Sequence, residues 1–338
     1  MKGALLVNLG SPDSTSTNDV KKYLDEFLMD KRVIDTPYLL RAFIVKGIIL
    51  NTRPKKSAEA YKKIWWKEGS PLIVLSERLH KKVKEHSNIP VELAMRYGKP
   101  SIQNGIKNLA DKGVTEIFLI PLYPQFAMAT TETIVVLANK IIKKQFPQIK
   151  LTNFPAFYNN EKYIKVLSTT IQTELEKKNP EHLLFSYHGV PERHIKKSDI
   201  TKSHCKIDGS CCNTTSVAHE FCYRHQCYET TKLVAKQLNL KEGTFSTSFQ
   251  SRLGRDPWLQ PYTNKTIDTL ALNGIKNLAV VTPAFISDCL ETLEEIGIEA
   301  KESFLENGGE KFNTIPCLND NDEWVKTVTK WINNWAKN

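Results

Sequence analysis

Short apolar runs alternate along the chain with stretches in which apolar residues recur every three or four positions. Gly3–Gly10 and His182–His188 are runs of the first kind, and Asn18–Asp30 and Glu161–Lys177 belong to the second. The runs predict buried strands, because a strand of a parallel sheet is covered on both faces. The spaced pattern predicts amphipathic helices, and the alternation of the two is typical of α/β domains with parallel sheets.

A weak internal repeat suggests two similar halves. Ile106–Pro121 resembles Ile267–Thr282, and in both a helical pattern ends at a glycine before an apolar strand. We therefore predict two Rossmann-like, doubly wound domains at 1–155 and 156–310 with a cleft between them, and a strand and helix at 311–338 that pack back on the first domain. The same patterns predict further strands at Val91–Tyr97, Glu116–Tyr123, Thr244–Gln250, Asn277–Pro283 and Phe312–Cys317, and further helices at Ser101–Lys112, Thr131–Gln145, Glu229–Leu238, Lys265–Leu272, Asp288–Ile296 and from Asp322.

The segment Tyr38–Leu50 is apolar except for Arg41 and Lys46, and it is too short to span a bilayer. It fits either a core-facing helix or an apolar lip that meets an apolar substrate or a membrane surface. The chain starts without the features of a secretory signal, which predicts a cytoplasmic protein, peripheral at the inner face of the membrane if the lip binds lipid.

The net charge is +10, but the lysines are scattered and no nucleic-acid recognition motif accompanies them. An anionic small molecule or lipid head groups explain such a charge better than nucleic acid does. The chain has no P-loop, no GxGxxG after the first strand and no GxSxG, so the usual motifs of nucleotide binding and serine hydrolysis are missing. Nothing in the pattern indicates an oligomeric state.

Two strand ends carry candidate chemistry, and ligands of open α/β sheets bind at the carboxyl ends of strands. His188 ends the strand before Gly189, and its imidazole can act as a base or a metal ligand. Asp288, Glu291 and Glu295 follow another strand on one face of the expected helix. Acidic residues at a helix start also serve as caps, so a structural role competes with a cation path.

Six sequence blocks resemble the ferrochelatase family, in the family's order, from the first strand to about Pro316. The resemblance implies a porphyrin cleft between two Rossmann-like domains and insertion of Fe²⁺ into protoporphyrin IX to give protohaem, with porphyrin and Fe²⁺ as the binding partners. The blocks are VNLGSP at Val7–Pro12, MRYG at Met95–Gly98, YPQF at Tyr123–Phe126, SYHGVPERH at Ser186–His194, FQSRLGRDPW at Phe249–Trp258 and SDCLETLEEI at Ser287–Ile296.

By this resemblance His188 and Glu291 are the catalytic residues, with His188 as pyrrole proton acceptor or metal ligand. Asp288, Glu291 and Glu295 form a path for metal or protons. The substrate-binding residues implied by the family are Arg53, Ser70, Arg96, Tyr123 and Trp258. Leu9 stands where relatives associated with coproporphyrin carry tyrosine, which favours protoporphyrin IX.

Other functions stay open on the sequence. A two-lobed protein that binds a metal or a tetrapyrrole shares the expected architecture, because fold alone does not give function. A chelatase for another metal, or for another porphyrin such as coproporphyrin III, is a second alternative. A binding protein needs no base, so the pairing of His188 with Glu291 favours the enzyme.

Five cysteines crowd into a segment between two of the matching blocks, and this segment, at 195–227, looks partly like an insertion. Thiols stay reduced in the cytoplasm, so metal binding is favoured over disulfides. The spacing C-x5-C-C-x9-C-x4-C is not a standard zinc pattern. A subset of ferrochelatases resembles this chain in carrying an internal segment that binds a [2Fe–2S] cluster, for which four thiolates suffice. Zinc is the alternative, and the candidates are Cys205, Cys211, Cys212, Cys222 and Cys227.

Overall fold

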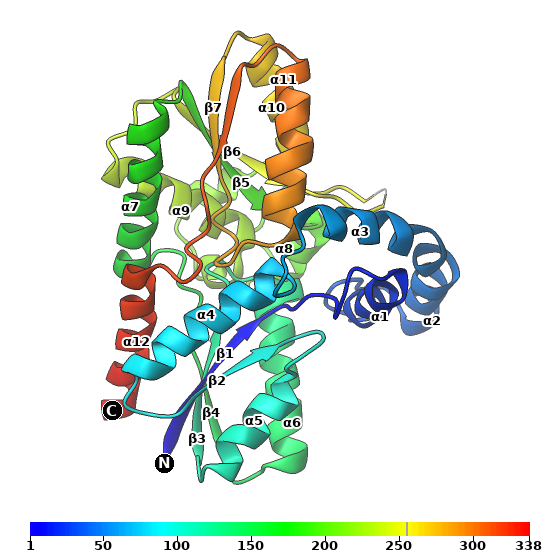
Figure 1. Cartoon of the computed structure of the whole chain (residues 1–338), viewed down its shortest axis with the longest axis vertical. Helices are drawn as coiled ribbons and strands as arrows, with labels where there is room; N and C mark the ends of the chain where they lie inside the picture. Colours follow the sequence, from blue (N-terminus) through cyan, green and yellow to red (C-terminus); the bar gives the residue numbers. More distant parts are fainter. Residues whose placement is uncertain (255) are drawn as a thin grey trace.

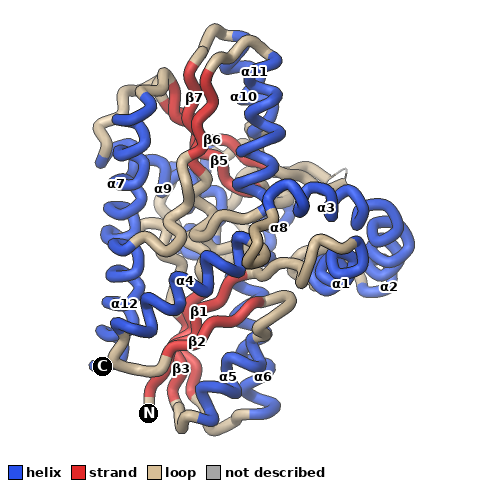
Figure 2. Tube along the Cα trace, in the orientation of Figure 1, coloured by secondary structure: helices blue, strands red, loops and turns tan. Residues whose placement is uncertain are grey.

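Two four-stranded parallel sheets form the framework of the computed structural model, which describes residues 1–254 and 256–338. The first sheet has the strand order β2-β1-β3-β4 and the second β6-β5-β7-β8 (Figures 1 and 2). The prediction of two parallel α/β sheets is confirmed. The strands are β1 (Lys2–Asn8), β2 (Val91–Met95), β3 (Glu116–Pro121), β4 (Lys150–Asn153), β5 (His182–His188), β6 (Phe245–Gln250), β7 (Asn277–Val281) and β8 (Lys311–Thr314).

The two sheets are built alike. In each, the first strand of the half pairs in parallel with the second and the third, and the fourth pairs with the third. The repeated sequence segments occupy equivalent places, because α5 leads to β3 in one half and α10 leads to β7 in the other. Gly113 and Gly274 follow these helices with φ of 80° and 93°. The internal repeat predicted from the sequence is thus visible in the strand order.

Helices cover both sheets, and their bounds differ in places from the expected ones. Strand β4 and helices α3, α4 and α8 were not predicted, and α9 begins at Tyr223 rather than at Glu229. The α-helices are α1 (Thr17–Leu28), α2 (Tyr38–Ala42), α3 (Leu50–Ile64), α4 (Pro71–His86), α5 (Ile102–Asp111), α6 (Thr133–Gln145), α7 (Glu161–Lys178), α8 (Glu192–Ser198), α9 (Tyr223–Gln237), α10 (Thr263–Leu272), α11 (Lys301–Glu306) and α12 (Asp322–Lys337). The π-helices are η1 (Phe43–Ile49), η2 (Met128–Glu132) and η5 (Glu291–Ala300), and short 3₁₀ turns form η3 (Ser210–Asn213) and η4 (Val217–Phe221).

The C-terminal helix α12 packs against both α4 of the first half and α7 of the second, beside which it lies in Figure 1. Its tryptophans enter an aromatic cluster. Trp335 stacks on Phe118 with 4.8 Å between ring centroids, and Trp331 lies 4.5 Å from Phe154. One buried cluster therefore includes residues of both sheets and of α12. The domain boundaries expected near residues 155 and 310 stay predictions.

Helices α1, α2, α3 and η1 project sideways from the framework (Figure 1). Together they form a lip that is larger than the predicted one at Tyr38–Leu50. The inner side of the lip is buried around Val20, Val45 and Tyr61, and Leu290 and Leu293 of the second half pack against it. Its outer side exposes large apolar residues, namely Tyr38, Leu39, Leu40, Phe43 and Ile48. Within residues 1–254 and 256–338 no helix combines the length and the apolar character that crossing a bilayer requires.

Candidate functional site

The candidate site lies at the point in each sheet where the strand order reverses. In both sheets the first and third strands are neighbours, with connections that leave in opposite directions, and such switch points are where α/β sheets bind ligands. The carboxyl end of β5 delivers His188, and the segment after β7 leads to Glu291. In the first sheet, Asn8 ends β1 and Tyr123 follows β3.

The imidazole of His188 is held in one tautomer. Its Nδ1 lies 2.6 Å from the carbonyl oxygen of Gly189, and because a carbonyl only accepts, Nδ1 must donate. In the neutral ring the proton is then on Nδ1, and Nε2 keeps its lone pair. His188 is half-buried, and its ring lies beside the rings of Trp258 and Phe285, with centroids 6.4 and 6.3 Å away. A bare basic nitrogen between aromatic rings suits a proton acceptor or a metal ligand.

The turn after His188 requires close backbone approach. The N–H of Gly189 donates to the carbonyl of Gln250 at 2.6 Å. A Cβ on Gly189 would stand 3.0 Å from the carbonyl oxygens of Gln250 and Ser251, so a larger residue would push the ends of β5 and β6 apart. Trp258 donates its indole N–H to Leu253 at 3.0 Å and closes the same loop. Arg255, which belongs to the Phe249–Trp258 block, lies outside the described residues.

A row of carboxylates runs along η5. Gln250 donates from Nε2 to the carbonyl of Glu291 at 2.9 Å and to Glu295 Oε2 at 3.2 Å, and Ser251 donates to the same Oε2 at 2.6 Å. Burial, followed by the charge of Glu291, raises the pKa of Glu295, although His188 acts in the opposite direction. Glu295 therefore interacts electrostatically with both predicted catalytic residues. Long π-helices are rare and concentrate at functional sites.

Asp288 lies apart from this row. Its carboxylate accepts hydrogen bonds from Thr292 at 2.8 Å, from the Asn319 side chain at 2.7 Å and from the backbone N–H of Cys317. These bonds cap the start of the helical segment and tie it to the loop after β8. These contacts fit the capping alternative for Asp288, and its place in the metal or proton path stays a prediction. Glu299 continues the row that Glu291 and Glu295 begin.

Three tyrosines of the first half stand opposite η5, of which Tyr61 and Tyr123 are buried and Tyr23 is partly buried. Burial raises the pKa of Tyr23, Tyr61 and Tyr123 well above the usual value, and Glu291 contributes to each shift. The Tyr123 hydroxyl donates to Asn8 Oδ1 at 2.6 Å and accepts from the N–H of Leu9 at 3.1 Å. Sequence reasoning missed Tyr23 and Tyr61, because nothing in helical spacing tells an inward tyrosine of the lip from an ordinary core residue.

The other predicted substrate-binding residues are spread more widely. Arg96 pairs with Asp30 and donates from Nε to Thr133 at 2.7 Å, so its guanidinium is engaged inside the first half. Ser70 is buried at the N-terminal cap of α4. Arg53 is exposed on α3, on the lip. The site assignments for these residues stay predictions.

Two of the five clustered thiols, Cys211 and Cys212, contact one guanidinium, and Cys205 and Cys222 lie close to this pair. Arg224 donates from Nε to Cys212 Sγ at 3.3 Å and from Nη2 to Cys211 Sγ at 3.5 Å, and the N–H of Lys206 lies 3.2 Å from Cys211 Sγ. A hydrogen bond from Cys222, reinforced by Arg224, lowers the pKa of Cys212 to about 6. Burial raises the pKa of Cys205, with smaller effects from Cys211 and Cys212.

Cys227 differs from the other four. It is fully buried in α9 within the apolar core, and burial raises the pKa of its thiol. Within the described ranges, no three His, Cys, Asp or Glu side chains surround a point that would hold a single metal ion. The three neighbouring histidines contact the backbone of the cysteine pair: His204 and His219 reach the carbonyl of Cys211, and His225 that of Cys212.

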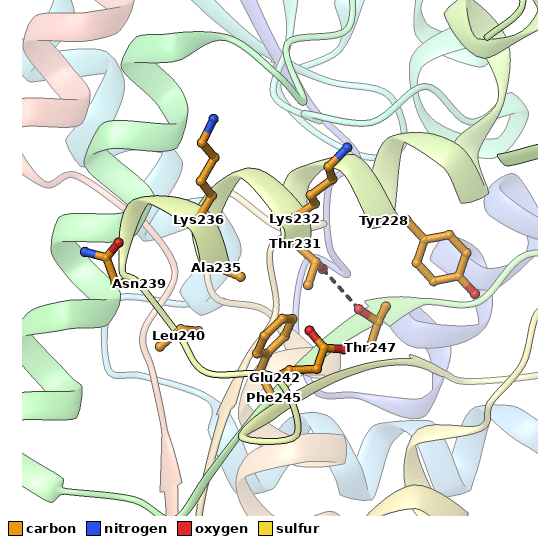
Figure 3. Close-up of a pocket in the computed structure, with 10 residues that line it drawn as sticks. All are labelled: Tyr228, Thr231, Lys232, Ala235, Lys236, Asn239, Leu240, Glu242, Phe245 and Thr247. Atoms are coloured by element: carbon orange, nitrogen blue, oxygen red, sulfur yellow. Dashed lines mark hydrogen bonds between the residues drawn. The ribbon is translucent and has the colours of Figure 1, made fainter. Parts of the chain in front are cut away.

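Two hollows lie on the second half. One, of about 240 Å³, opens between β6, α10 and η5 and is lined by Ser251, Glu295 and Glu299, so the carboxylate row reaches it. The other, of about 580 Å³, lies against α9 and β6, and Figure 3 shows Tyr228, Thr231 and Thr247 among its lining residues. None of the predicted site residues lines this second hollow.

Comparison with known proteins identifies the family. The family model described as ferrochelatase matches residues 1–335. A ferrochelatase of Stutzerimonas stutzeri is 47% identical over 328 residues and covers 96% of each chain. A ferrochelatase of Ectopseudomonas mendocina is 48% identical over 326 residues, which are 96% of this chain and 95% of the relative.

Solved structures confirm the fold. A cobalt complex of the sirohydrochlorin chelatase SirB from Bacillus subtilis subspecies spizizenii has a TM-score of 0.55 at 11% identity, covering 100% of this chain and 96% of SirB. SirB from Bacillus subtilis with Fe³⁺ has a TM-score of 0.53 at 12% identity, covering 97% and 93%. At these identities the likeness concerns the fold alone. The match of the whole chain to the family model and to relatives nearly half identical shows that the chain belongs to the ferrochelatase family.

Proposed function

We propose that this protein inserts Fe²⁺ into protoporphyrin IX, releasing the two pyrrole protons and forming protohaem. Family membership supports the reaction, and the tautomer of His188 is the observation that carries the mechanism. With Nδ1 donating to the carbonyl of Gly189, Nε2 is the atom that accepts a pyrrole proton or contacts the entering metal. Trp258 and Phe285 beside the imidazole offer aromatic faces to a planar macrocycle.

The carboxylate row carries the metal or the protons to or from the site. Glu291, Glu295 and Glu299 lead from the neighbourhood of His188 to the hollow between β6, α10 and η5. Carboxylates bind Fe²⁺ and pass protons, so this row serves as a path for one or both. The raised pKa of Glu295 suits a group that takes up and releases protons. Arg53 on the lip is the cation for a porphyrin propionate.

The reaction is tested by mixing the protein with Fe²⁺ and protoporphyrin IX without oxygen and following the haem absorption bands. Glu291→Gln should reduce the rate by about 10²–10⁴-fold, the usual weight of a group that moves protons in the reaction. Glu302→Gln, an exposed change on α11, is the matched control and should keep the parent rate. Porphyrin binding without haem formation would instead make the chain a binding protein.

A second porphyrin separates the proposal from its closest alternative. Coproporphyrin III carries more propionates than protoporphyrin IX, so a higher kcat/KM for coproporphyrin III would overturn the assignment of protoporphyrin. The backbone N–H of Leu9 donates to the side chains of Asn8 and Tyr123, which fixes the backbone just after β1. Leu9→Tyr tests whether this position sets the preference between the two porphyrins.

We propose further that the cysteine-rich segment holds a [2Fe–2S] cluster through Cys205, Cys211, Cys212 and Cys222. In a [2Fe–2S] cluster the four thiolates are divided between two iron ions. The cluster is therefore compatible with the finding that, among the described residues, no three such side chains surround a single metal ion. The N–H donors of Arg224 and Lys206 toward the sulfurs fit thiolates that carry negative charge. The cluster would supply no step of metal insertion, which needs no electron transfer.

Metal analysis tests the cluster. Two irons and two sulfides per chain are expected in the purified protein, and Cys212→Ser should lose them. Cys227→Ser is the matched control and should keep them, since this thiol is fully buried in the apolar core. One zinc without sulfide would replace the cluster by the zinc alternative.

The lip offers a contact for the membrane surface. Leu39 on α2 and Phe43 on η1 are 81% and 66% exposed. Lys46 lies on η1, and Arg53 and Lys55 lie on α3, which follows η1 directly. Apolar residues flanked by cations bind anionic bilayers at the interface. The protein should float with vesicles that contain phosphatidylserine, and Phe43→Ser together with Leu39→Ser should abolish this. Flotation unchanged by both substitutions would contradict the proposal.

A further inference from the structure

Helix α9 connects the cysteine-rich segment directly to the predicted catalytic histidine. Its first residue, Tyr223, lies between Cys222 and Arg224, the residue whose guanidinium contacts two thiols. The hydroxyl of Tyr223 donates to the backbone carbonyl of His188 at 2.8 Å. Two consecutive residues therefore contact the backbone of His188 and the sulfurs, respectively.

The direction of this hydrogen bond is fixed. A carbonyl oxygen only accepts, so the tyrosine hydroxyl must donate. Tyr223 is buried, so the bond is shielded from solvent. The bond is thus present whenever α9 holds its place.

The peptide that joins His188 to Gly189 directly precedes the carbonyl that orients the imidazole. That carbonyl, of Gly189, accepts the hydrogen bond from Nδ1, and the N–H of the His188–Gly189 peptide donates to the carbonyl of Gln250. Tyr223 holds this peptide from the side opposite Gln250. A shift of Tyr223 would therefore rotate the peptide and, with it, the ring whose Nε2 reacts.

Helix α9 and the turn before it, η4, also contact the first half of the protein. Gln226 accepts from the N–H of Phe126 at 2.7 Å, and Thr230 accepts from Gln125 at 3.1 Å. The Phe221 ring meets Phe126 edge to face with 5.0 Å between centroids. The segment thus touches both the histidine and the YPQF loop that carries Tyr123.

We propose that Tyr223 is a positioning residue for His188, through which the arrangement of the cysteine-rich segment sets the geometry of the reacting imidazole. The inference rests on the proposed role of His188 in metal insertion. It does not require that the thiols hold iron, because the contacts of Tyr223 and Arg224 exist in the chain itself.

Tyr223→Phe tests the proposal, with Tyr228→Phe as the matched control. Both tyrosines lie on α9 directly after a cysteine, but Tyr228 lines the hollow of Figure 3 and, within the described part of the chain, makes no hydrogen bond to the site. Loss of one neutral hydrogen bond corresponds to about a three- to ten-fold fall in kcat for Tyr223→Phe, with the KM for porphyrin unchanged. Tyr228→Phe should stay within about two-fold of the parent. Equal kcat values for the two variants would overturn the proposal.

A second measurement is independent of turnover. Coupling between two sites is reciprocal, so occupancy of the site must change the reactivity of the thiols. Saturating free-base protoporphyrin IX should slow the labelling of the thiols by a disulfide reagent in the parent and in Tyr228→Phe. In Tyr223→Phe the protection should be lost, and equal protection in all three proteins would refute the coupling.

The two hypotheses fail separately. If His188→Asn retains activity, the proposed function of His188 fails, whatever Tyr223 does. If His188→Asn is inactive but Tyr223→Phe matches Tyr228→Phe in kcat and in thiol protection, only the positioning role fails. Iron and sulfide content decides the cluster without reference to either result.

Discussion

Replacement of His188 by asparagine separates its two hydrogen-bonding sides. The amide nitrogen of asparagine takes the place of Nδ1 and keeps the bond to the carbonyl of Gly189, which is 2.6 Å long in the parent. No atom replaces Nε2, so the basic nitrogen is lost. Alanine loses both sides, and His86→Asn, on an exposed residue of α4, serves as the control.

The two changes should differ in stability but not in activity. A neutral hydrogen bond contributes about 1 kcal/mol net, so His188→Ala should lower the free energy of unfolding by about that amount, while His188→Asn should lie near the parent. Loss of a general base costs about 10²–10⁴-fold in kcat, or about 3–5 kcal/mol on the barrier. Both variants should therefore be almost inactive.

Anaerobic haem formation and urea denaturation measure these quantities. If His188 acts as base, kcat should fall with the KM for Fe²⁺ unchanged, whereas a metal ligand should raise that KM. Activity of His188→Asn within ten-fold of the parent would refute the assignment of Nε2 as the reacting atom. Equal destabilisation of the alanine and asparagine variants would refute the tautomer.

Three further predictions concern the buried side chains of Glu295, Asp35 and Trp324. Burial and Glu291 raise the pKa of Glu295, so the fold disfavours the charged carboxylate, and stability is lost as pH rises from the ordinary pKa of 4.5 through the raised one. Glu295→Gln should therefore melt at a higher temperature than the parent at about pH 8. A difference in melting temperature that is the same at about pH 4 and pH 8 would contradict this. Burial alone would raise the pKa of Asp35, but hydrogen bonds from Lys197 and Arg193 hold it well below its usual range, so stability is lost as pH falls. Asp35→Asn should lower the free energy of unfolding by about 2 kcal/mol at neutral pH. The free energy of unfolding of this variant should also fall less steeply than that of the parent as the pH is lowered. Trp324→Ala should cost about 3–5 kcal/mol by calorimetry, because the ring is fully buried, and a cost below about 1 kcal/mol would show that α12 does not stabilise the core.

Much of the framework was predictable because it depends on local pattern. The apolar run that forms β5 has the same bounds in the sequence and in the structure, and α7 differs by one residue. Both lie in regular alternation, where burial on both faces or on one stripe dictates the element. By contrast, α9 begins earlier than expected, because its first turn carries tyrosine, arginine, histidine and cysteine, whose burial comes from contacts with distant segments.

The candidate site divides in the same way. A strand end with a following glycine pointed to His188, and acidic residues after β7 pointed to Glu291, because sheet topology brings strand ends together. Helical spacing grouped Asp288 with them, but the π-helix begins only at Glu291, and Asp288 turns to Asn319 instead. The wider turn of a π-helix changes which side chains align on one face, and the residue pattern did not predict a π-helix here.

The sequence by itself determined the family, the two parallel sheets and the residue types at the strand ends, since these depend on periodicity and on motifs read in order. Only the tertiary structure decided which atom of His188 is free, which thiols share the Arg224 guanidinium and that Tyr223 reaches the His188 carbonyl. Each of these is a contact between residues distant in the chain or a choice between two ring nitrogens. Such contacts depend on how the elements pack, and packing is a property of the whole fold rather than of any segment.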